Sequence, residues 1–279
     1  MRDNVTPGAP MQFLKVDDAV LHYQVIGGPE NGPVLVFANA LGTDFRIWRD
    51  VIVRLVGKFT ILTYDKRGHG LSETGEGPVT IARHAEDLAA IMDHAGLGSA
   101  VICGLSVGGL IAQQLYIDRR DLVSALILCD TAAKLGDADS WNQRIAKVEA
   151  NGISSLADTV MANWFTAQFR ADRSEELAGY RTMLERQSPN GYIATCAAIR
   201  DADLREKARQ IGVPAICVVG DQDGSTPVEM VGGLAKAIPG SRFEVIKGAG
   251  HLPCVETPER LADIILVFVG GLENRATLN

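Results

Sequence analysis

Cys103-Gly104-Leu105-Ser106-Val107-Gly108-Gly109 is the stretch that decides the fold of this chain. It follows the apolar run 100–102 and precedes residues 110–115, whose apolar spacing predicts a helix. Gly-X-Ser-X-Gly between a strand and a helix is typical of a nucleophile elbow, a turn so tight that its serine is held in strained backbone geometry. Side chains two residues before and after the serine would collide, and glycine has none. The flanks therefore favour a nucleophile at Ser106 over an ordinary glycine-rich loop.

The composition of the 279-residue chain is that of a globular protein, with 47% hydrophobic and 22% charged residues. At this length roughly three quarters of the unfolded surface can be buried, so an ordinary hydrophobic core suffices. A net charge of −7 without a basic stripe argues against nucleic acid or an anionic membrane as a partner. An anionic small substrate stays compatible with this charge, because one cation inside a pocket is enough.

The five cysteines lack Cys-X-X-Cys spacing, and three of them lie within or at the end of apolar, strand-like runs. Cysteine in such runs behaves as a small buried hydrophobe, so we expect free thiols and a reducing compartment. Residues 1–10 are polar and lack the apolar region of a signal peptide, and no segment is apolar enough over a sufficient length to cross a bilayer. These features predict a cytoplasmic protein.

Alternating β and α patterns surround the elbow and predict an α/β fold, a mostly parallel twisted sheet with helices on both faces. Polarity alternates over residues 12–26 around Asp17-Asp18, which indicates a hairpin at one edge of the sheet. Continuous apolar runs predict buried strands at residues 34–38, 59–64, 100–104, 122–129, 213–219 and 242–246. Helices are expected at residues 48–56, 80–95 and 228–238 and from Thr257 onward.

The pattern changes between about residues 135 and 210, where no strand-like run occurs. Helices are predicted there at residues 140–150, 153–165, 174–187 and 190–200. Loops that leave the carboxyl ends of parallel strands surround the ligand crevice, so a block of helices at that edge is more naturally a lid than an ornament. We therefore expect one core domain, formed by residues 1–134 and 211–279, and a helical cap of residues 135–210.

A serine hydroxyl is a weak nucleophile and needs a base within hydrogen-bond reach. His251 lies in a glycine-rich loop after the last predicted strand, where it can reach the carboxyl edge of the sheet, and is the predicted base. His69, in Arg67-Gly68-His69-Gly70, is expected to fix its own loop. The remaining histidines are expected at the solvated surface; they are His22, His84 and His94.

The acid that orients this base must come from a loop between the serine and the histidine. Asp223 follows the strand after the insertion, and Asp221 is two residues closer to that strand. Asp130 ends the strand before the insertion, where some hydrolases place their acid. Each could instead be a turn carboxylate that caps a helix. Asp223 is the preferred acid, and Asp130 is the next candidate.

Two backbone N–H groups are needed to bind the oxyanion of a tetrahedral intermediate. One is expected from Val107, the residue after the nucleophile, and the other from Asn39-Ala40-Leu41-Gly42, where position favours Leu41. No metal is expected, because the histidines are far apart and form no His-X-X-X-His or Cys/His cluster. No cofactor is expected either, because the elbow matches neither Gly-X-Gly-X-X-Gly nor a Walker motif. Serine rather than aspartate at the nucleophile position argues against carbon–halogen displacement.

With these residues assembled, the chain resembles the α/β-hydrolase superfamily over nearly its whole length and is most similar to the 3-oxoadipate enol-lactonases. The resemblance is carried by residues 37–44 (FANALGTD), 65–72 (DKRGHGLS), 103–113 (CGLSVGGLIAQ), 129–134 (CDTAAK), 141–145 (WNQRI), 163–165 (NWF) and 198–205 (AIRDADLR). It implies a catalytic triad of Ser106, Asp223 and His251. The implied activity is that of a serine esterase that opens a lactone in the β-ketoadipate pathway of aromatic catabolism.

An anionic lactone would need a cation beneath the lid. Lys134, Arg144 and Arg200 are the candidates, and Trp141 and Trp164 could line the pocket. The expected partner is therefore a small lactone or ester, and the oligomeric state is left open. Two other functions stay open: a broader carboxylesterase, aryl-lactonase or perhydrolase with the same triad, and a non-catalytic ligand receptor on the same fold.

Overall fold

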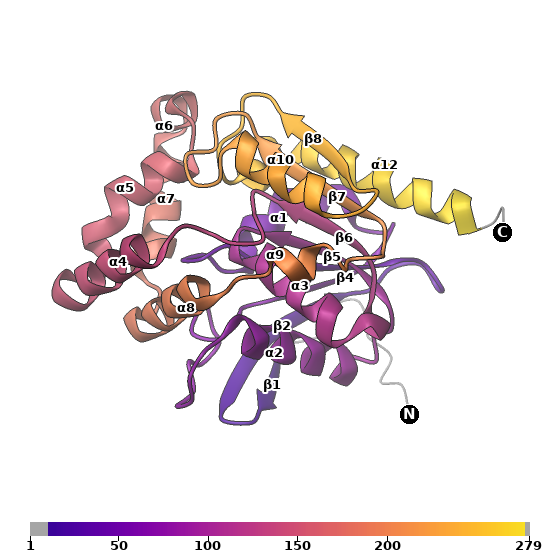
Figure 1. Cartoon of the computed structure of the whole chain (residues 1–279), viewed down its shortest axis with the longest axis horizontal. Coiled ribbons are helices and arrows are strands. Elements are labelled where there is room, and N and C mark those ends of the chain that lie inside the picture. Colours follow the sequence, from indigo (N-terminus) through magenta and orange to yellow (C-terminus); the bar gives the residue numbers. More distant parts are fainter. Residues whose placement is uncertain (1–10, 277–279) are drawn as a thin grey trace.

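Eight strands form one sheet in the computed structural model, which describes residues 11–276 of the chain (Figure 1). Their order is β1-β2-β4-β3-β5-β6-β7-β8. The pairs β1–β2 and β2–β4 are antiparallel and the other five are parallel, which confirms the mostly parallel sheet. The strands are β1 (Gln12–Val16), β2 (Ala19–Ile26), β3 (Val34–Ala38), β4 (Thr60–Tyr64), β5 (Ala100–Leu105), β6 (Val123–Cys129), β7 (Ala215–Gly220) and β8 (Arg242–Ile246).

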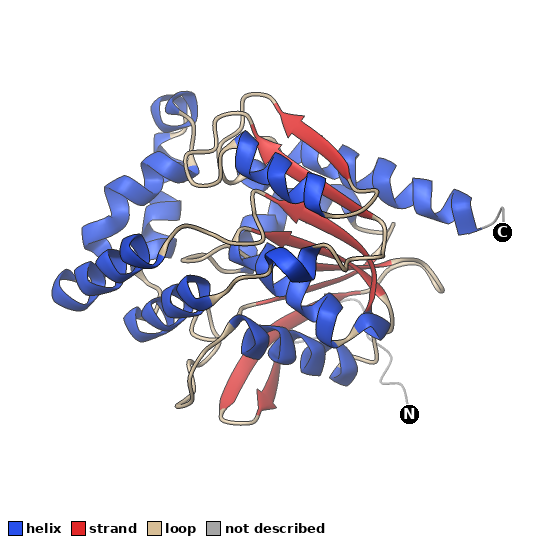
Figure 2. Cartoon of the chain, viewed as in Figure 1, coloured by secondary structure: helices blue, strands red, loops and turns tan. Residues whose placement is uncertain are grey.

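Helices cover both faces of this sheet (Figure 2). On one face α1 packs against α12, and on the other α2 packs against α3, with α10 lying over β7 and β8. Because both faces are covered, the central strands β3 to β7 are almost entirely buried, as parallel sheets require. These helices are α1 (Arg49–Leu55), α2 (Ile81–His94), α3 (Val107–Asp118), α10 (Val228–Ala237), α11 (Pro253–Glu256) and α12 (Pro258–Ala276), with 3₁₀ turns at η1 (Phe45–Trp48) and η2 (Arg120–Leu122).

The chain between β6 and β7 is helical, as its sequence predicts. Helix α4 packs along α8, and Figure 1 shows α4, α5, α6, α7 and α8 grouped beside the sheet. The segment comprises α4 (Ala138–Asn151), η3 (Ile153–Leu156), α5 (Ala157–Trp164), α6 (Ala167–Asp172), α7 (Ser174–Glu185), α8 (Pro189–Asp201) and α9 (Arg205–Ala208). Helix α9 contacts α3 and α10. The division into a core and a cap at residues 135 and 210 stays a prediction.

Two histidines predicted at the surface are buried, so that prediction was wrong. His84 in α2 is fully buried, because α8 packs over α2 and brings Thr195 Oγ1 to 3.3 Å from His84 Nε2. His22 in β2 is 4% exposed and its Nδ1 lies 2.8 Å from Asp65 Oδ2. His94, at the end of α2, is exposed as expected.

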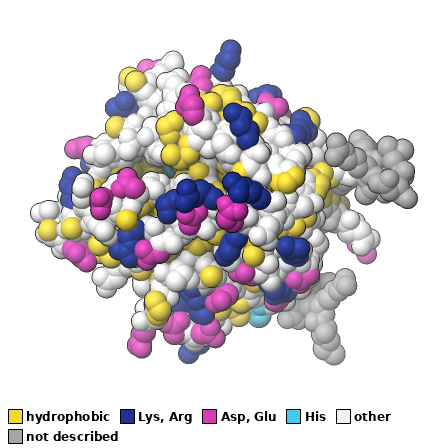
Figure 3. Space-filling model, in the orientation of Figure 1, with side chains coloured by type: hydrophobic (Ala, Val, Ile, Leu, Met, Phe, Trp, Pro, Cys, Tyr) yellow, Lys and Arg dark blue, Asp and Glu magenta, His cyan; other side chains and the backbone are white. Residues whose placement is uncertain are grey.

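Charged side chains of both signs are mixed on the face seen in Figure 3. Ion pairs within the chain, such as Arg205–Asp203 and Arg209–Glu206, join the two signs. Exposed pairs of this kind contribute little to stability individually. Between residues 11 and 276 the chain contains no helix that is both long and apolar enough to span a membrane. The prediction made from the polarity of residues 1–10 lies outside the described residues.

Candidate active site

Ser106 lies at the turn from β5 into α3 with the strained backbone that the motif predicts. Its φ is 57° and its ψ is −119°, a region that non-glycine residues seldom adopt and that costs about 1–3 kcal/mol. Two hydrogen bonds to its backbone hold it there: Ser106 N donates to Cys129 O at 3.0 Å, and the Thr131 hydroxyl donates to Ser106 O at 2.7 Å. A Cβ on Gly104 would lie 2.3 Å from Gly108 O, and one on Gly108 would lie 2.1 Å from Ala38 O. Only glycine fits these two positions.

Asp223 and His251 form a buried pair, with Asp223 Oδ2 2.8 Å from His251 Nδ1. The carboxylate also accepts hydrogen bonds from Ser225 N at 2.7 Å, from Thr226 N at 2.9 Å and from the Thr226 hydroxyl. Burial alone would raise the pKa of Asp223, but the charge and hydrogen bond of His251 and the donors of Thr226 outweigh it and lower the pKa to about 2. Asp223 is therefore ionised at neutral pH and can orient the imidazole.

The loop that carries His251 is tied down on both sides. His251 N donates to Trp164 O at 2.9 Å, at the end of α5. Gly250 N donates to Glu256 Oε2 at 2.6 Å, and the other oxygen of Glu256 accepts from the backbone and hydroxyl of Thr166. Glu256 therefore joins the His251 loop to the segment that links α5 and α6.

The two competing aspartates lie elsewhere. Asp221 is exposed and accepts from Gly248 N at 2.8 Å. Asp130 is fully buried, and its Oδ1 accepts from Gly220 N at 2.9 Å. Of the three aspartates, it is Asp223 that bonds to the imidazole of His251.

The loop after β3 is held by buried polar groups. Lys66 Nζ donates to Ala40 O at 2.6 Å and to Thr43 O at 3.3 Å, on either side of Leu41. The side chain of Asn39 bridges Tyr64 O and the indole N–H of Trp48, each at 2.8 Å. Within the described residues, neither Leu41 N nor Val107 N has a hydrogen-bond acceptor. Both N–H groups are therefore available to a ligand.

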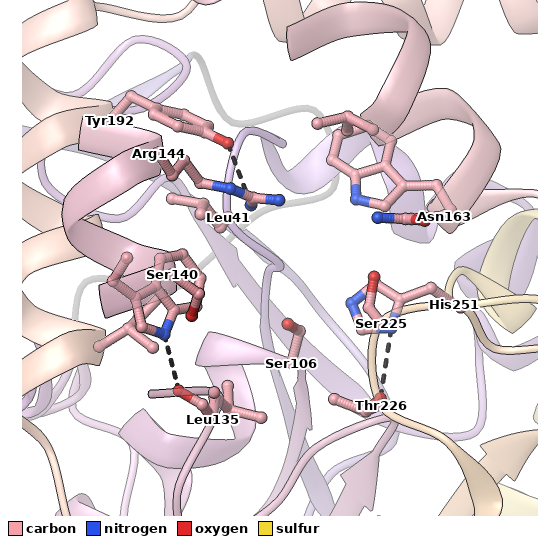
Figure 4. A pocket seen from close by; sticks show the side chains of 16 residues that line it. Leu41, Ser106, Leu135, Ser140, Arg144, Asn163, Tyr192, Ser225, Thr226 and His251 are labelled. Carbon is pink, nitrogen blue, oxygen red and sulfur yellow. Dashed lines mark hydrogen bonds between the residues drawn. The ribbon is translucent and has the colours of Figure 1, made fainter. Parts of the chain in front are cut away.

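A cavity of about 260 Å³ lies between the elbow and the helices that follow β6. Figure 4 shows Ser106 pointing into it, with His251 on one side and Arg144 and Tyr192 across from them. The side-chain hydrogen bonds of His251 in the described structure go to Asp223 and Thr226 and not to the Ser106 hydroxyl. Hydrogen bonds between a nucleophile and its base are often long before substrate binds. The lining residues are Leu41, Ser106, Leu135, Gly136, Ser140, Trp141, Arg144, Val160, Asn163, Trp164, Tyr192, Ile199, Gly224, Ser225, Thr226 and His251.

The structure brings three of the five predicted substrate-binding side chains to this cavity: Trp141, Arg144 and Trp164. Lys134 and Arg200 are not among its lining residues. Lys134 Nζ lies 3.8 Å from Asp203 Oδ2, and Arg200 bonds to Asp201 at 2.7 Å and to Asn142 at 2.8 Å. Both cations are satisfied outside the cavity.

Tyr192 lines the cavity and was not predicted. Its hydroxyl lies 3.5 Å from Arg144 Nη1, and the guanidinium lies 5.2 Å from the centre of the Trp141 ring. The residue sits in α8, and nothing in the local sequence shows which side of that helix faces Ser106. Only the packing of α8 against α4 turns it inward.

Residues 33–258 match the sequence model of the alpha/beta hydrolase fold. The chain belongs to this family. A 3-oxoadipate enol-lactonase of Acinetobacter baylyi is 35% identical over 246 residues, which are 88% of this chain and 91% of the relative. The crystal structure of the enol-lactonase from Burkholderia xenovorans LB400 superposes with a TM-score of 0.89 at 34% identity and covers 93% of this chain and 100% of that one.

A thermophilic esterase from Thermogutta terrifontis is also similar, with a TM-score of 0.86 at 27% identity over 94% of this chain and 99% of the esterase. Lactones are cyclic esters, so these relatives act on one kind of bond. This member of the family is therefore a carboxylic ester hydrolase, as its sequence predicts.

Proposed function

We propose that this chain opens a lactone by serine acyl transfer, and that its substrate is 3-oxoadipate enol-lactone, which would be converted to 3-oxoadipate in aromatic catabolism. The main support is the cavity in which the strained Ser106, the Asp223-bound His251 and the cation Arg144 meet. The similarity to enol-lactonases over most of the chain agrees with this cavity.

In the proposed mechanism the Ser106 hydroxyl attacks the lactone carbonyl while His251 Nε2 takes its proton. Asp223 holds the Nδ1–H side of the ring and stabilises the imidazolium. Leu41 N and Val107 N bind the oxyanion of the tetrahedral intermediate. Collapse of this intermediate breaks the ring C–O bond, and the enol oxygen leaves with a proton from His251 but stays tethered within the acyl-enzyme.

Deacylation repeats the cycle with water. His251 takes a proton from the water, whose oxygen attacks the ester carbonyl, and returns the proton to Ser106 as the serine leaves. The released product has a new carboxylate and an enol that tautomerises to the ketone. An enol oxygen is a better leaving group than an alkoxide, so ring opening needs little further assistance.

We assign recognition of the substrate carboxylate to Arg144. No carboxylate within the described residues pairs with it, and it lines the cavity opposite His251. Tyr192 and Trp141 hold the guanidinium, and Trp164 offers an apolar wall. Lys134 and Arg200 are left out of this proposal, because acidic side chains already occupy them.

The same proposal gives the helices between β6 and β7 the role of a cap. Helix α4 supplies Arg144, α5 supplies Trp164 and α8 supplies Tyr192, so one side of the cavity is built from residues 135–210. All five cysteines are free and buried, which suits the reducing cytoplasm that we propose as the location.

The test compares kcat/KM on the anionic enol-lactone with kcat/KM on neutral aryl esters. Arg144→Gln is expected to lower the first about 10- to 100-fold, the range for losing one hydrogen bond to a charged group, and to leave the second unchanged. Arg200→Gln, at a paired cation outside the cavity, is the matched control and should change neither. Comparable efficiency on both substrates would replace the proposal by a broader carboxylesterase, aryl-lactonase or perhydrolase.

A covalent label separates an enzyme from a ligand receptor. A phosphonate should label Ser106 stoichiometrically, and Ser106→Ala should abolish the label. Absence of labelling on the folded wild-type protein would favour the receptor.

A further inference from the structure

A second carboxyl group lies beside the Asp223–His251 pair. Asp130 follows β6 directly, is fully buried and has a φ of 47°. One oxygen of Asp130, one of Asp223 and one ring nitrogen of His251 all lie within 4.8 Å of one another. Because the mechanism above uses only Asp223, this second carboxyl needs its own explanation.

The two oxygens of Asp130 differ in their surroundings. Oδ1 accepts a hydrogen bond from Gly220 N at 2.9 Å, and Oδ2 is buried without a hydrogen-bond partner among the described residues. A buried ionised carboxylate can only accept and is destabilised when one oxygen has no donor, whereas a protonated one can itself donate from that oxygen. The free oxygen therefore has the place that an O–H donor would occupy.

Acidic groups and thiols, rather than lysine or arginine, surround Asp130 in the described part of the chain. The titratable groups that face it are Asp223 from the loop after β7, Cys129 from β6 and Cys254 from α11, with His251 in the same cluster. No Lys or Arg within residues 11–276 forms an ion pair with Asp130. Isolated buried charges are strongly disfavoured, and two carboxylates this close do not both ionise.

Between the two carboxyls, Asp223 is the one that stays charged. It accepts from two backbone N–H groups, from the Thr226 hydroxyl and from His251, whereas Asp130 accepts from one N–H. Hydrogen bonds to an oxygen favour its ionised form. If one of the two carboxyls is protonated, the proton is therefore on Asp130 and not on Asp223.

We propose that Asp130 is a protonated carboxylic acid whose Oδ2–H donates to the Asp223 carboxylate, and that it is a positioning residue for the Asp223–His251 pair. This inference rests on the proposed function only in taking His251 as the base. A neutral Asp130 adds one more donor that fixes Asp223, and it keeps a second negative charge away from the imidazole. Burial, followed by the negative charge of Asp223, raises the pKa of Asp130 well above its usual range, in agreement with the geometry.

Such an arrangement matters for proton transfer. A second carboxylate beside His251 would favour the imidazolium over the neutral base that has to accept the serine proton. With Asp130 neutral, His251 faces one charge, and its free nitrogen can accept the serine proton. Asparagine at this position would preserve both contacts, because its carbonyl accepts from Gly220 N and its NH₂ donates to Asp223.

The experiment combines infrared spectroscopy with pH–rate profiles on a neutral aryl ester. At neutral pH the wild-type protein should show the C=O stretch of a buried carboxylic acid, and Asp130→Asn should lack it. Asp130→Asn should keep kcat/KM within about threefold and leave the acidic limb of the profile in place. Asp130→Ala should lower kcat about 10- to 100-fold with little change in KM, since Asp223 loses one donor.

Asp221→Asn is the matched control, because Asp221 follows β7 as Asp130 follows β6 but is exposed. It should keep both the infrared band and the rate. Absence of the acid band in the wild type would overturn the inference, as would an acidic limb that moves to lower pH in Asp130→Asn. Activity lost to a chelator and restored by a divalent cation would also overturn it, since the cluster would then hold a metal. A band that is present in a protein without lactonase activity would refute the proposed substrate and leave this inference standing.

Discussion

Lys66→Met tests whether a buried ammonium group supports the proposed oxyanion-binding loop. Lys66 is 1% exposed, and its Nζ donates to the carbonyls of Ala40 and Thr43. The Ala40 carbonyl and the Leu41 N–H belong to the same peptide group. The ammonium therefore fixes that peptide and polarises its N–H, which is one of the two proposed oxyanion donors. Methionine keeps a similar chain length and removes the charge and the donors.

The magnitude follows from the pKa of the lysine. Burial lowers it from the ordinary 10.5 to about 7, and the charges of Asp65 and Asp44 offset this only in part. The unfolded chain then binds the proton more tightly than the folded chain, so the free energy of unfolding of the wild type rises with pH between about 7 and 10.5. The full shift corresponds to at most about 5 kcal/mol, at about 1.4 kcal/mol per pH unit. Lys66→Met has no such group, so its free energy of unfolding should not rise in this way. Between about pH 7 and 10.5 the wild type should therefore become more stable relative to Lys66→Met by up to that amount.

The assay is urea denaturation of both proteins at a series of pH values from 6.5 to about 10.5, which gives the free energy of unfolding from the midpoint and the m-value. Lys58→Met, at an exposed lysine just before β4, is the control and should run parallel to the wild type. The kcat of Lys66→Met on a neutral aryl ester should fall at least about tenfold, because an oxyanion donor is loosened. Parallel stability curves for wild type and Lys66→Met would refute the buried-charge reasoning. An unchanged kcat would refute the support of Leu41.

Three further changes test the elbow, the histidine loop and the acid. Gly108→Ala should destabilise the protein by more than about 3 kcal/mol, because its Cβ would lie 2.1 Å from Ala38 O. In the control Gly233→Ala, in α10, the new Cβ meets nothing within 4 Å and should stabilise the protein by about 0.5–1 kcal/mol. Denaturation midpoints measure both changes. Glu256→Ala should lower the free energy of unfolding by about 1–3 kcal/mol and lower kcat, because Gly250 N loses its acceptor. Glu256→Gln keeps an acceptor oxygen and should lower both quantities less. Because the pKa of Asp223 is lowered to about 2, the free energy of unfolding of the wild type should fall by about 2 kcal/mol as the pH falls from about 4 to 2. Denaturation of Asp223→Asn over the same pH range should not show this fall.

The positions of the strands and of the main helices along the chain could be predicted from hydrophobic patterns and capping residues, but the order of the strands within the sheet was not predicted. The strands predicted at residues 34–38 and 242–246 coincide with β3 and β8, and Thr80 caps α2 because its side chain accepts a hydrogen bond from Arg83 N. The short helices α6, α9 and α11 were missed, since four to six residues carry no readable period. His84 was misplaced for a different reason: the residue that covers it, Thr195, is 111 positions away in the chain.

The candidate site divides in the same way. The position of Ser106 could be predicted because the tight turn at the elbow requires glycine at fixed spacing from the serine. These glycines and the serine lie within seven consecutive residues, so the pattern is visible in the sequence. The inward orientation of Arg144 and Tyr192 depends on how α4 packs against α8. No local pattern encodes that packing, which is why Tyr192 was missed and why Lys134 and Arg200 ranked equally with Arg144.

The local sequence does not show whether Asp130 or Asp223 bonds to His251. Strands β6 and β7 are neighbours, so an aspartate after either one reaches the same edge of the sheet. Asp223 comes three residues after β7, at the start of a turn whose two N–H groups and one hydroxyl bond back to its carboxylate. Asp130 follows β6 immediately and meets a single N–H. The same side chain is therefore charged in one loop and neutral in the other, because the number of donors each loop supplies, and not the residue type, decides which aspartate holds His251.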